Sequence, residues 1–132
     1  ILETLISVGL GYLTLGQEIQ SLSGGEAGRI RLARELSKRS TGKTLYLFDE
    51  PTIGLHSDDI AKLLPIFTAL VDTGNTDIII ENNLDILAAA DHLIDLGPGA
   101  GAQGGKIIAS GTPEELSKRA SSLTGKYLAK IL

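Results

Sequence analysis

A run of four apolar residues, Leu-Tyr-Leu-Phe at 45–48, ends in the two acidic residues Asp49 and Glu50. Because no polar residue interrupts it, the run is typical of a strand in a sheet that is covered on both faces. Three further strands are expected along the chain, at 76–80, 92–96 and 106–109. Helical patterns separate several of these strands, and such alternation favours an α/β fold with a mostly parallel sheet flanked by helices.

Helices are expected between and around these strands. They are 3–9, the segment that begins at Ser23, 57–73, 84–90 with Asn82 or Asn83 as its cap, and the segments that begin at Thr112 and Thr124. Ser23 and Glu26 have the spacing of a capping box, in which the hydroxyl and the carboxylate each accept a free backbone N–H. Ser57 is the expected N-cap of the helix over 57–73, and Pro65 should kink or split that helix.

Size and composition limit the possible classes of protein. The chain has 132 residues, about the size of one domain on a prior of ~100–200 residues. Its formal net charge of −4 gives the chain as a whole no electrostatic attraction to nucleic acid. It has no cysteine, which excludes disulfides and thiolate zinc sites, and no apolar stretch of ~18 residues. It also has no methionine, so we expect it to be a piece of a longer protein.

Two segments carry candidate chemistry. Ser23-Gly24-Gly25 offers free N–H groups, a hydroxyl and the positive end of a helix dipole, which together suit an anion, although an ordinary capped helix has the same pattern. Asp49 at a strand end can hold Mg²⁺, and the neighbouring Glu50 can polarise a water for attack on a phosphate. A solvated acidic turn is the alternative for this pair.

Two other segments bear on phosphate binding. Gly42-Lys43-Thr44 lacks the preceding strand and the following helix of a phosphate-binding P-loop, so we expect this chain to lack the loop that grips the β and γ phosphates of ATP. A dense basic stretch is either a solvated helix face or a contact for phosphate or the DNA backbone. It consists of Arg29, Arg31, Arg34, Lys38 and Arg39.

Together these motifs resemble those of the ATP-binding-cassette (ABC) ATPases. Leu-Ser-Gly-Gly-Glu at 22–26 resembles the family's signature motif, and 45–50 resembles its Walker B strand with the catalytic glutamate. The closer resemblance is to the UvrA family, the damage-recognition ATPases of bacterial nucleotide excision repair. It is carried by Leu-Ser-Gly-Gly-Glu-Ala at 22–27, Asp-Glu-Pro-Thr at 49–52, Gly-Leu-His at 54–56, Asn-Leu-Asp at 83–85, Ile-Asp-Leu-Gly-Pro at 94–98 and Gly-Thr-Pro-Glu-Glu at 111–115.

This resemblance implies that residues 1–132 are the C-terminal portion of the second nucleotide-binding domain of such a protein, without its Walker A segment. Residues 1–43 would be the signature-helix region, and 44–132 the Walker B strand and the C-terminal α/β core. Glu50 would be catalytic, and Asp49 would bind Mg²⁺, directly or through water. The residues implied to bind ATP are Ser23, Gly24, Gly25, Glu26 and Asn82.

The resemblance also implies partners and a setting. The whole protein would be a cytoplasmic ATPase that forms a homodimer, scans double-stranded DNA for damage and loads its partner protein UvrB. Each ATP would lie between two nucleotide-binding domains of one chain, so Ser23–Gly25 would face ATP held by the first domain. Asp49 and Glu50 would face ATP held by the second. The family's zinc modules would lie outside this segment, no membrane partner is expected, and the segment alone should be inactive.

Three positions depart from the pattern of this family. Asn82 replaces the usual switch histidine that contacts the γ-phosphate, Gly28 replaces a glutamine, and Ile53 replaces a threonine. Asn82 motivates a second hypothesis, a cassette with impaired hydrolysis that serves as a nucleotide-gated DNA-binding or partner-binding module. A transporter ATPase component is a third hypothesis. Gly-Leu-His at 54–56 disfavours it, because transporter cassettes usually have Ala-Leu-Asp there.

Overall fold

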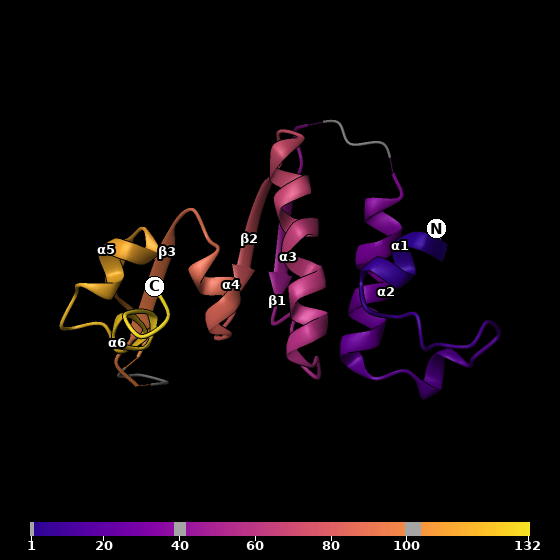
Figure 1. Ribbon diagram of the computed structural model, residues 1–132, viewed down its shortest axis with the longest axis horizontal. Helices are drawn as coiled ribbons and strands as arrows, with labels where there is room; N and C mark the ends of the chain where they lie inside the picture. The colour runs from indigo at the N-terminus through magenta and orange to yellow at the C-terminus, as the bar shows by residue number, and fades with distance from the viewer. Residues whose placement is uncertain (1, 39–41, 100–103) are drawn as a thin grey trace. The chain divides into compact units, whose positions relative to one another are not determined.

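The computed structural model describes residues 2–38, 42–99 and 104–132. These residues form two compact units, one that ends at Glu81 and one that begins at Asn82. Within the described residues, each unit holds one two-stranded sheet (Figure 1). No described helix is both long and apolar enough to cross a bilayer. The assignment of residues 1–132 to one domain stays a prediction.

The helices and strands expected from the sequence are present, with shifted ends. The first unit contains α1 (Leu2–Ser7), the short 3₁₀ helix η1 (Ile19–Ser21), α2 (Gly24–Leu36), β1 (Leu45–Asp49), α3 (Ser57–Asp72) and β2 (Thr76–Ile80). The second unit contains α4 (Leu84–Ala88), β3 (Leu93–Gly97), β4 (Lys106–Gly111), α5 (Pro113–Ser117) and α6 (Leu123–Leu128).

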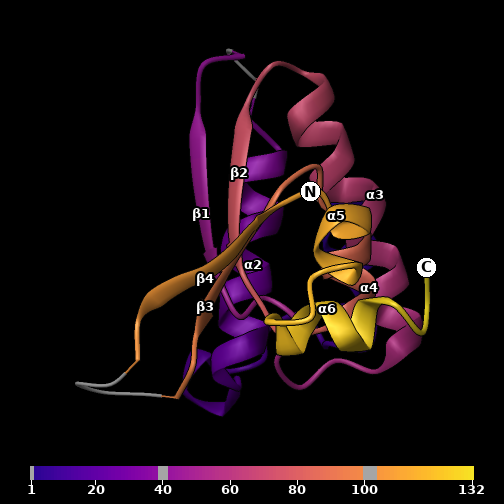
Figure 2. The same cartoon turned by 90° about the vertical axis from the view of Figure 1, so that its left-hand side faces the viewer.

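The sheet of the first unit is parallel. β1 and β2 lie side by side, in a register that pairs Asp49 with Ile80 at their carboxyl ends (Figure 2). α3 covers one face of this sheet, where the ring centroid of Phe48 lies 5.1 Å from that of Phe67. The apolar stripe of α3 supplies the core on this side, with Ile60, Leu63, Phe67 and Leu70 buried. The α/β class expected from the alternating pattern is therefore confirmed.

The second face of this sheet is uncovered in the described residues, contrary to the expectation from the apolar run. The exposed fractions of its large side chains are 63% for Leu45, 67% for Leu47, 48% for Ile78 and 53% for Ile80. Neighbouring side chains on a strand point to opposite faces, so Tyr46 and Phe48 pack against α3 while Leu45 and Leu47 face away. The apolar run has the composition of a strand with both faces covered, but the described residues cover only the face that packs against α3.

The second sheet adds an antiparallel pair of strands to the expected mostly parallel arrangement. β3 pairs with β4 in antiparallel orientation, with an irregular register between Asp95 and Leu96. A parallel pair needs a crossover of about a dozen residues or more, whereas the connection at 98–105 is shorter than that. Gly99 and Gly105, on either side of the residues that are not described, have positive φ angles of 77° and 71°. Of the expected loop at 97–105, residues 100–103 lie outside the described residues.

The second unit has a small core in which polar groups are paired. Leu93, Ala109, Leu116 and Leu128 are buried together. Asp95 of β3 accepts hydrogen bonds from Ser122 Oγ at 2.6 Å and Thr124 Oγ1 at 2.9 Å, which fix the start of α6. Asn83, one of the two expected caps of α4, accepts from the first backbone N–H groups of that helix.

Two expectations for α3 need correction. Its N-cap is His56 and not Ser57, because His56 has the extended backbone of a cap, with φ −76° and ψ 156°. Pro65 does not split α3, which runs from Ser57 to Asp72 as one helix, and a kink at Pro65 stays a prediction. Leu63 and Phe67, on either side of the proline, are buried in one core, so packing outweighs the missing backbone hydrogen bond.

Asp77 is an acidic residue near the start of β2, on the face of the sheet that packs against α3. It is half-buried, and neither carboxylate oxygen has a hydrogen-bond partner in the described part of the chain. Burial raises the pKa of Asp77 from 3.8 to about 6. The folded state therefore binds this proton more tightly than the unfolded chain does. The resulting stability is present in full below pH 3.8 and is lost as the pH rises through about 6.

We expect Asp77→Asn to raise the melting temperature at pH 7, because the substitution removes a buried charge at nearly constant volume. At pH 4 the folded protein holds Asp77 mostly protonated, so the same substitution should change the melting temperature little. Circular dichroism melts of both proteins at the two pH values measure this difference. An equal change at both would contradict the assignment of the pH dependence to Asp77.

Candidate functional site

The turn Ser23-Gly24-Gly25 leads into α2 through the expected capping box. The backbone N–H of Glu26 donates to Ser23 Oγ at 3.2 Å, and the backbone N–H of Ser23 donates to Glu26 Oε2 at 2.6 Å. Ser23 and Gly24 are exposed, so this end of the helix is open to solvent. Since the first N–H groups of a helix have no partner within it, the turn presents donors to an anion.

Glu26 shapes this turn. Its second carboxylate oxygen accepts a hydrogen bond from the Tyr12 hydroxyl. The hydrogen bonds from Tyr12 and from the Ser23 N–H hold the pKa of Glu26 below its ordinary value. The hydrogen bond to Glu26 raises the pKa of Tyr12 in turn. Because a carboxylate repels phosphate, the donors for an anion are those of the turn itself. A direct contact from Glu26 to ATP stays a prediction.

Gly25 packs against the segment that follows Glu50. A Cβ atom on Gly25 would lie 2.7 Å from the carbonyl oxygen of Ile53 and 3.5 Å from Nη1 of Arg29. A Cβ atom on Gly24 would meet nothing within 4 Å. Packing therefore requires the second glycine, whereas the first faces open space.

The basic stretch does not form one solvated face, because Arg29 is 4% exposed. The buried residues of α2 are Arg29, Leu32 and Ala33. Their spacing of three and four residues is that of one helix face, so the apolar periodicity could have revealed the burial of Arg29. Its Nε and Nη1 atoms have no hydrogen-bond partner within the described part of the chain. The other basic residues of this stretch that the structure describes, Arg31, Arg34 and Lys38, are exposed, and Arg39 lies outside the described residues.

Asp49 and Glu50 lie at the carboxyl end of β1, and both are exposed. Glu50 continues the pairing with β2 by donating its N–H to the carbonyl of Ile80 at 2.9 Å. Its φ of 45° is in the left-handed region, and no other non-glycine residue among those described has a positive φ. This conformation costs about 1–2 kcal/mol and is found disproportionately at functional positions.

Glu81 is a third acidic residue at this edge that sequence reasoning missed. Its Oε1 accepts hydrogen bonds from the Thr52 N–H at 2.8 Å and the Thr52 hydroxyl at 2.5 Å. Thr52 is buried, so this pairing ties the segment after Glu50 to the end of β2. The sequence feature that could have revealed Glu81 is its position directly after the second parallel strand, because the carboxyl ends of such strands meet at one sheet edge.

The carboxylates fit a partial magnesium site. Mg²⁺ is commonly bound by one or two carboxylates, and waters and phosphate oxygens complete its coordination. The exposed Asp49 can supply such a ligand. No cluster of three His, Asp or Glu residues within the described ranges is placed to hold a metal ion. Asn82, the expected phosphate contact, begins the second unit, and its role stays a prediction.

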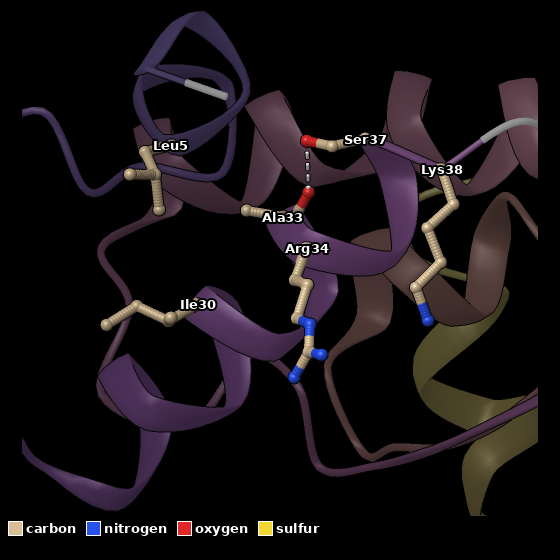
Figure 3. A pocket seen from close by; sticks show the side chains of 6 residues that line it. All are labelled: Leu5, Ile30, Ala33, Arg34, Ser37 and Lys38. Atoms are coloured by element: carbon tan, nitrogen blue, oxygen red, sulfur yellow. Dashed lines mark hydrogen bonds between the residues drawn. The ribbon is translucent and has the colours of Figure 1, made fainter.

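A cavity of about 290 Å³ lies between α1 and α2. Figure 3 shows its lining, which combines the apolar side chains of Leu5 and Ile30 with Arg34 and Lys38. Ile30 follows Gly24 by about 9 Å along the helix axis, at 1.5 Å per residue. The cavity thus lies toward the opposite end of α2 and contains none of the predicted ATP-binding or catalytic residues.

The comparisons with known proteins agree on one relationship. No family model matches the chain. UvrABC system protein A of Clostridium tetani is 63% identical over 131 residues, and that of Bacillus subtilis is 60% identical over the same length. Each match covers 99% of this chain, and the chain spans 14% of the length of these curated relatives. The crystal structure of UvrA2 from Deinococcus radiodurans has a TM-score of 0.91 at 50% identity, over 97% of this chain and 16% of that one.

We expect Gly25→Ala to lower the free energy of unfolding by about 1–3 kcal/mol, because the added methyl group would overpack against the Ile53 carbonyl. Gly24→Ala is the matched control, since its methyl group enters open space. Replacement of the flexible glycine by alanine should raise the free energy of unfolding by up to about 1 kcal/mol. Urea unfolding of both variants measures the difference. If Gly25→Ala is as stable as Gly24→Ala, the close contact is not maintained in solution.

Proposed function

Because the chain is homologous over 99% of its length to one segment of UvrABC system protein A, we propose that it is the C-terminal part of that protein's second nucleotide-binding domain. The observation that carries the assignment of the site is the contact between Gly25 and Ile53. It holds the signature turn and the segment after Glu50 together in one compact unit. Two motifs that handle phosphate are thus fixed relative to one another.

The residues of this unit suit parts of ATP hydrolysis. The N–H groups of Gly24 and Gly25 and the Ser23 hydroxyl donate to the γ-phosphate of ATP held by another domain. Asp49 holds Mg²⁺, directly or through water, and the ion neutralises phosphate charge. Glu50 orients the attacking water, and its exposed carboxylate and fixed left-handed backbone support this role.

The uncovered sheet face supports a role as part of a larger domain. Leu45, Leu47, Ile78 and Ile80 form a continuous apolar surface on paired strands. Contiguous apolar surface of this kind marks a site of contact with further protein. The proposed cover is the remainder of the same nucleotide-binding domain, including its Walker A segment. The chain alone then holds one side of each ATP site and neither binds ATP tightly nor hydrolyses it.

The activity of the whole protein follows from the family to which the relatives belong. UvrABC system protein A is the damage-recognition component of the excision repair excinuclease, and we propose that this chain belongs to a protein with the same function. In this function, a homodimer in the cytoplasm uses ATP to scan double-stranded DNA for damage and to load UvrB. A transporter ATPase component is disfavoured, because the relatives and the solved structure are UvrA proteins.

Asn82 favours a second candidate, a cassette that binds nucleotide but hydrolyses it slowly. An asparagine amide donates a hydrogen bond to phosphate, but it does not take a positive charge as a histidine does. Such a cassette would use nucleotide occupancy to gate contact with DNA or a partner protein. The two candidates differ in the rate of hydrolysis and not in the residues that hold ATP.

In the longer polypeptide that contains this chain, Glu50→Gln should lower kcat for ATP by at least about a hundredfold, because the amide cannot act as a base. ATP binding should persist, since the side chain keeps its size. Steady-state phosphate release and equilibrium binding of a fluorescent ATP analogue measure the two properties. Asp91→Asn, which changes an exposed acid in the second unit, is the control. Turnover by the isolated chain that survives Glu50→Gln would contradict the proposal.

Asn82→His separates the two candidates. If Asn82 slows hydrolysis, the histidine should raise kcat in the longer polypeptide by about tenfold or more, within the usual range for a positioned proton-transfer group. If the neutral imidazole acts, the gain in kcat should fall at low pH, and if the charged imidazolium acts, it should fall at high pH. The pH profile of kcat distinguishes the two forms. An unchanged rate would exclude Asn82 as the cause of slow hydrolysis.

A further inference from the structure

We propose that Glu81 is a positioning residue for ATP hydrolysis, because its carboxylate holds the turn that begins at Glu50. This inference rests on the proposed function, which assigns Glu50 to the orientation of the attacking water. In its positioning role, Glu81 touches neither ATP nor that water. It acts through Thr52, two residues after Glu50, and keeps the Glu50 backbone in one conformation.

The turn over residues 50–53 directly follows β1. The N–H of Ile53 donates to the carbonyl of Glu50 at 3.2 Å, which closes the turn, and Pro51 occupies its second position. Proline is favoured at this position because its ring already fixes φ. Since proline has no N–H, three backbone donors remain in the turn, those of Glu50, Thr52 and Ile53. The acceptors of these three donors decide how firmly the turn is held.

The end of β2 supplies acceptors at two points of the turn. The N–H of Glu50 donates to the carbonyl of Ile80 at 2.9 Å, which extends the pairing of β1 with β2 by one residue. The next residue, Glu81, accepts at Oε1 from the Thr52 N–H at 2.8 Å and from the Thr52 hydroxyl at 2.5 Å. Thr52 is 9% exposed, so its N–H would be buried without this acceptor if Glu81 were removed, which costs free energy. The carboxylate therefore fixes the middle of the turn.

The backbone of Glu50 needs this support. Its φ of 45° is in the left-handed region, where a side chain meets the following carbonyl oxygen. Such a conformation persists only where the surrounding structure over-determines it. The bond from Glu50 to Ile80 holds one side of the residue, and the bonds from Thr52 to Glu81 hold the other. Without Glu81, the backbone after Glu50 can relax, and the exposed carboxylate of Glu50 loses its fixed direction.

The bonds to Thr52 use Glu81 as a hydrogen-bond acceptor. An acceptor does not need a negative charge, because an amide oxygen can accept the same two hydrogen bonds. A ligand of Mg²⁺ or a general base, in contrast, depends on the charge and basicity of the carboxylate. A neutral amide at position 81 therefore separates a positioning role from a direct chemical role.

The test measures ATP hydrolysis by the longer polypeptide and its binding of a fluorescent ATP analogue. Glu81→Ala should lower kcat by about tenfold to a hundredfold, because a misplaced Glu50 slows the chemical step. KM and analogue affinity should change by less than about twofold, since no contact with ATP is removed. Glu81→Gln keeps the acceptor oxygen, so its kcat should stay within about threefold of wild type. Glu3→Ala, which removes an exposed carboxylate of α1 in the same unit, is the control and should behave as wild type.

A double-mutant cycle tests whether Glu81 acts through Thr52. Thr52→Val removes the hydroxyl and keeps the backbone N–H, so it should lower kcat by about threefold or more at constant KM. In the Glu81→Ala background, Thr52→Val should have no further effect on kcat, because the bond is already absent. Full additivity of the two effects on the logarithm of kcat would overturn the inference.

The remaining outcomes also decide. If Glu81→Ala keeps the wild-type kcat, or lowers only the melting temperature, Glu81 does not position Glu50. A loss of kcat in Glu81→Gln as large as in Glu81→Ala would assign the carboxylate to the chemistry itself and would likewise overturn the inference. Should Glu81→Ala not fold, Thr52→Val decides, and an unchanged kcat would count against the role. The proposed function is tested separately, because it fails if hydrolysis survives Glu50→Gln.

Discussion

The first unit depends on the absence of a side chain at residue 25. The backbone of the signature turn approaches the Ile53 carbonyl so closely that a Cβ on Gly25 would stand 2.7 Å from it. This approach brings the amino end of α2, with its unpaired N–H groups, onto the segment that leaves β1. Because Ile53 is bonded to Glu50 in turn, one glycine sets the distance between two motifs that we propose bind different ATP molecules. Packing at Gly25 therefore determines the distance between the two motifs.

Both two-stranded sheets leave apolar side chains exposed in the described part of the chain. α3 covers one face of β1 and β2, while Leu45 and Ile78 remain exposed on the other. In the second unit, Ile94 and Ile107 are likewise exposed, at 61% and 67%. A two-stranded sheet is marginal by itself and needs cover or further strands. Under the proposed function, the segments that cover these sheets also bring the groups that complete the proposed ATP sites.

Local signals allowed much of this fold to be predicted. The spacing of Ser23 and Glu26 fixed the start of α2, because a capping box satisfies donors within four residues. The antiparallel pairing of β3 and β4 was missed, since orientation is decided by the length of a connection and not by strand composition. Arg29 was grouped with a basic stretch for which the alternatives were a solvated helix face and a phosphate or DNA contact, because its place on the buried stripe was not recognised. The pairing of Thr52 with Glu81 joins residues far apart in sequence, which no local pattern reveals.

The costly features of the described chain are unevenly distributed. The unpaired groups of Arg29 and Asp77 and the left-handed backbone of Glu50 are all in the first unit. The buried hydroxyl of Ser122 in the second unit is bonded on both sides, to Asp95 and to the N–H of Gly125. Strain and unpaired charge persist only where the surrounding structure holds them, and they concentrate where conformations must change. Among the described residues, the strained backbone and the unpaired buried charges are therefore in the first unit, whereas the second unit pairs its buried Ser122.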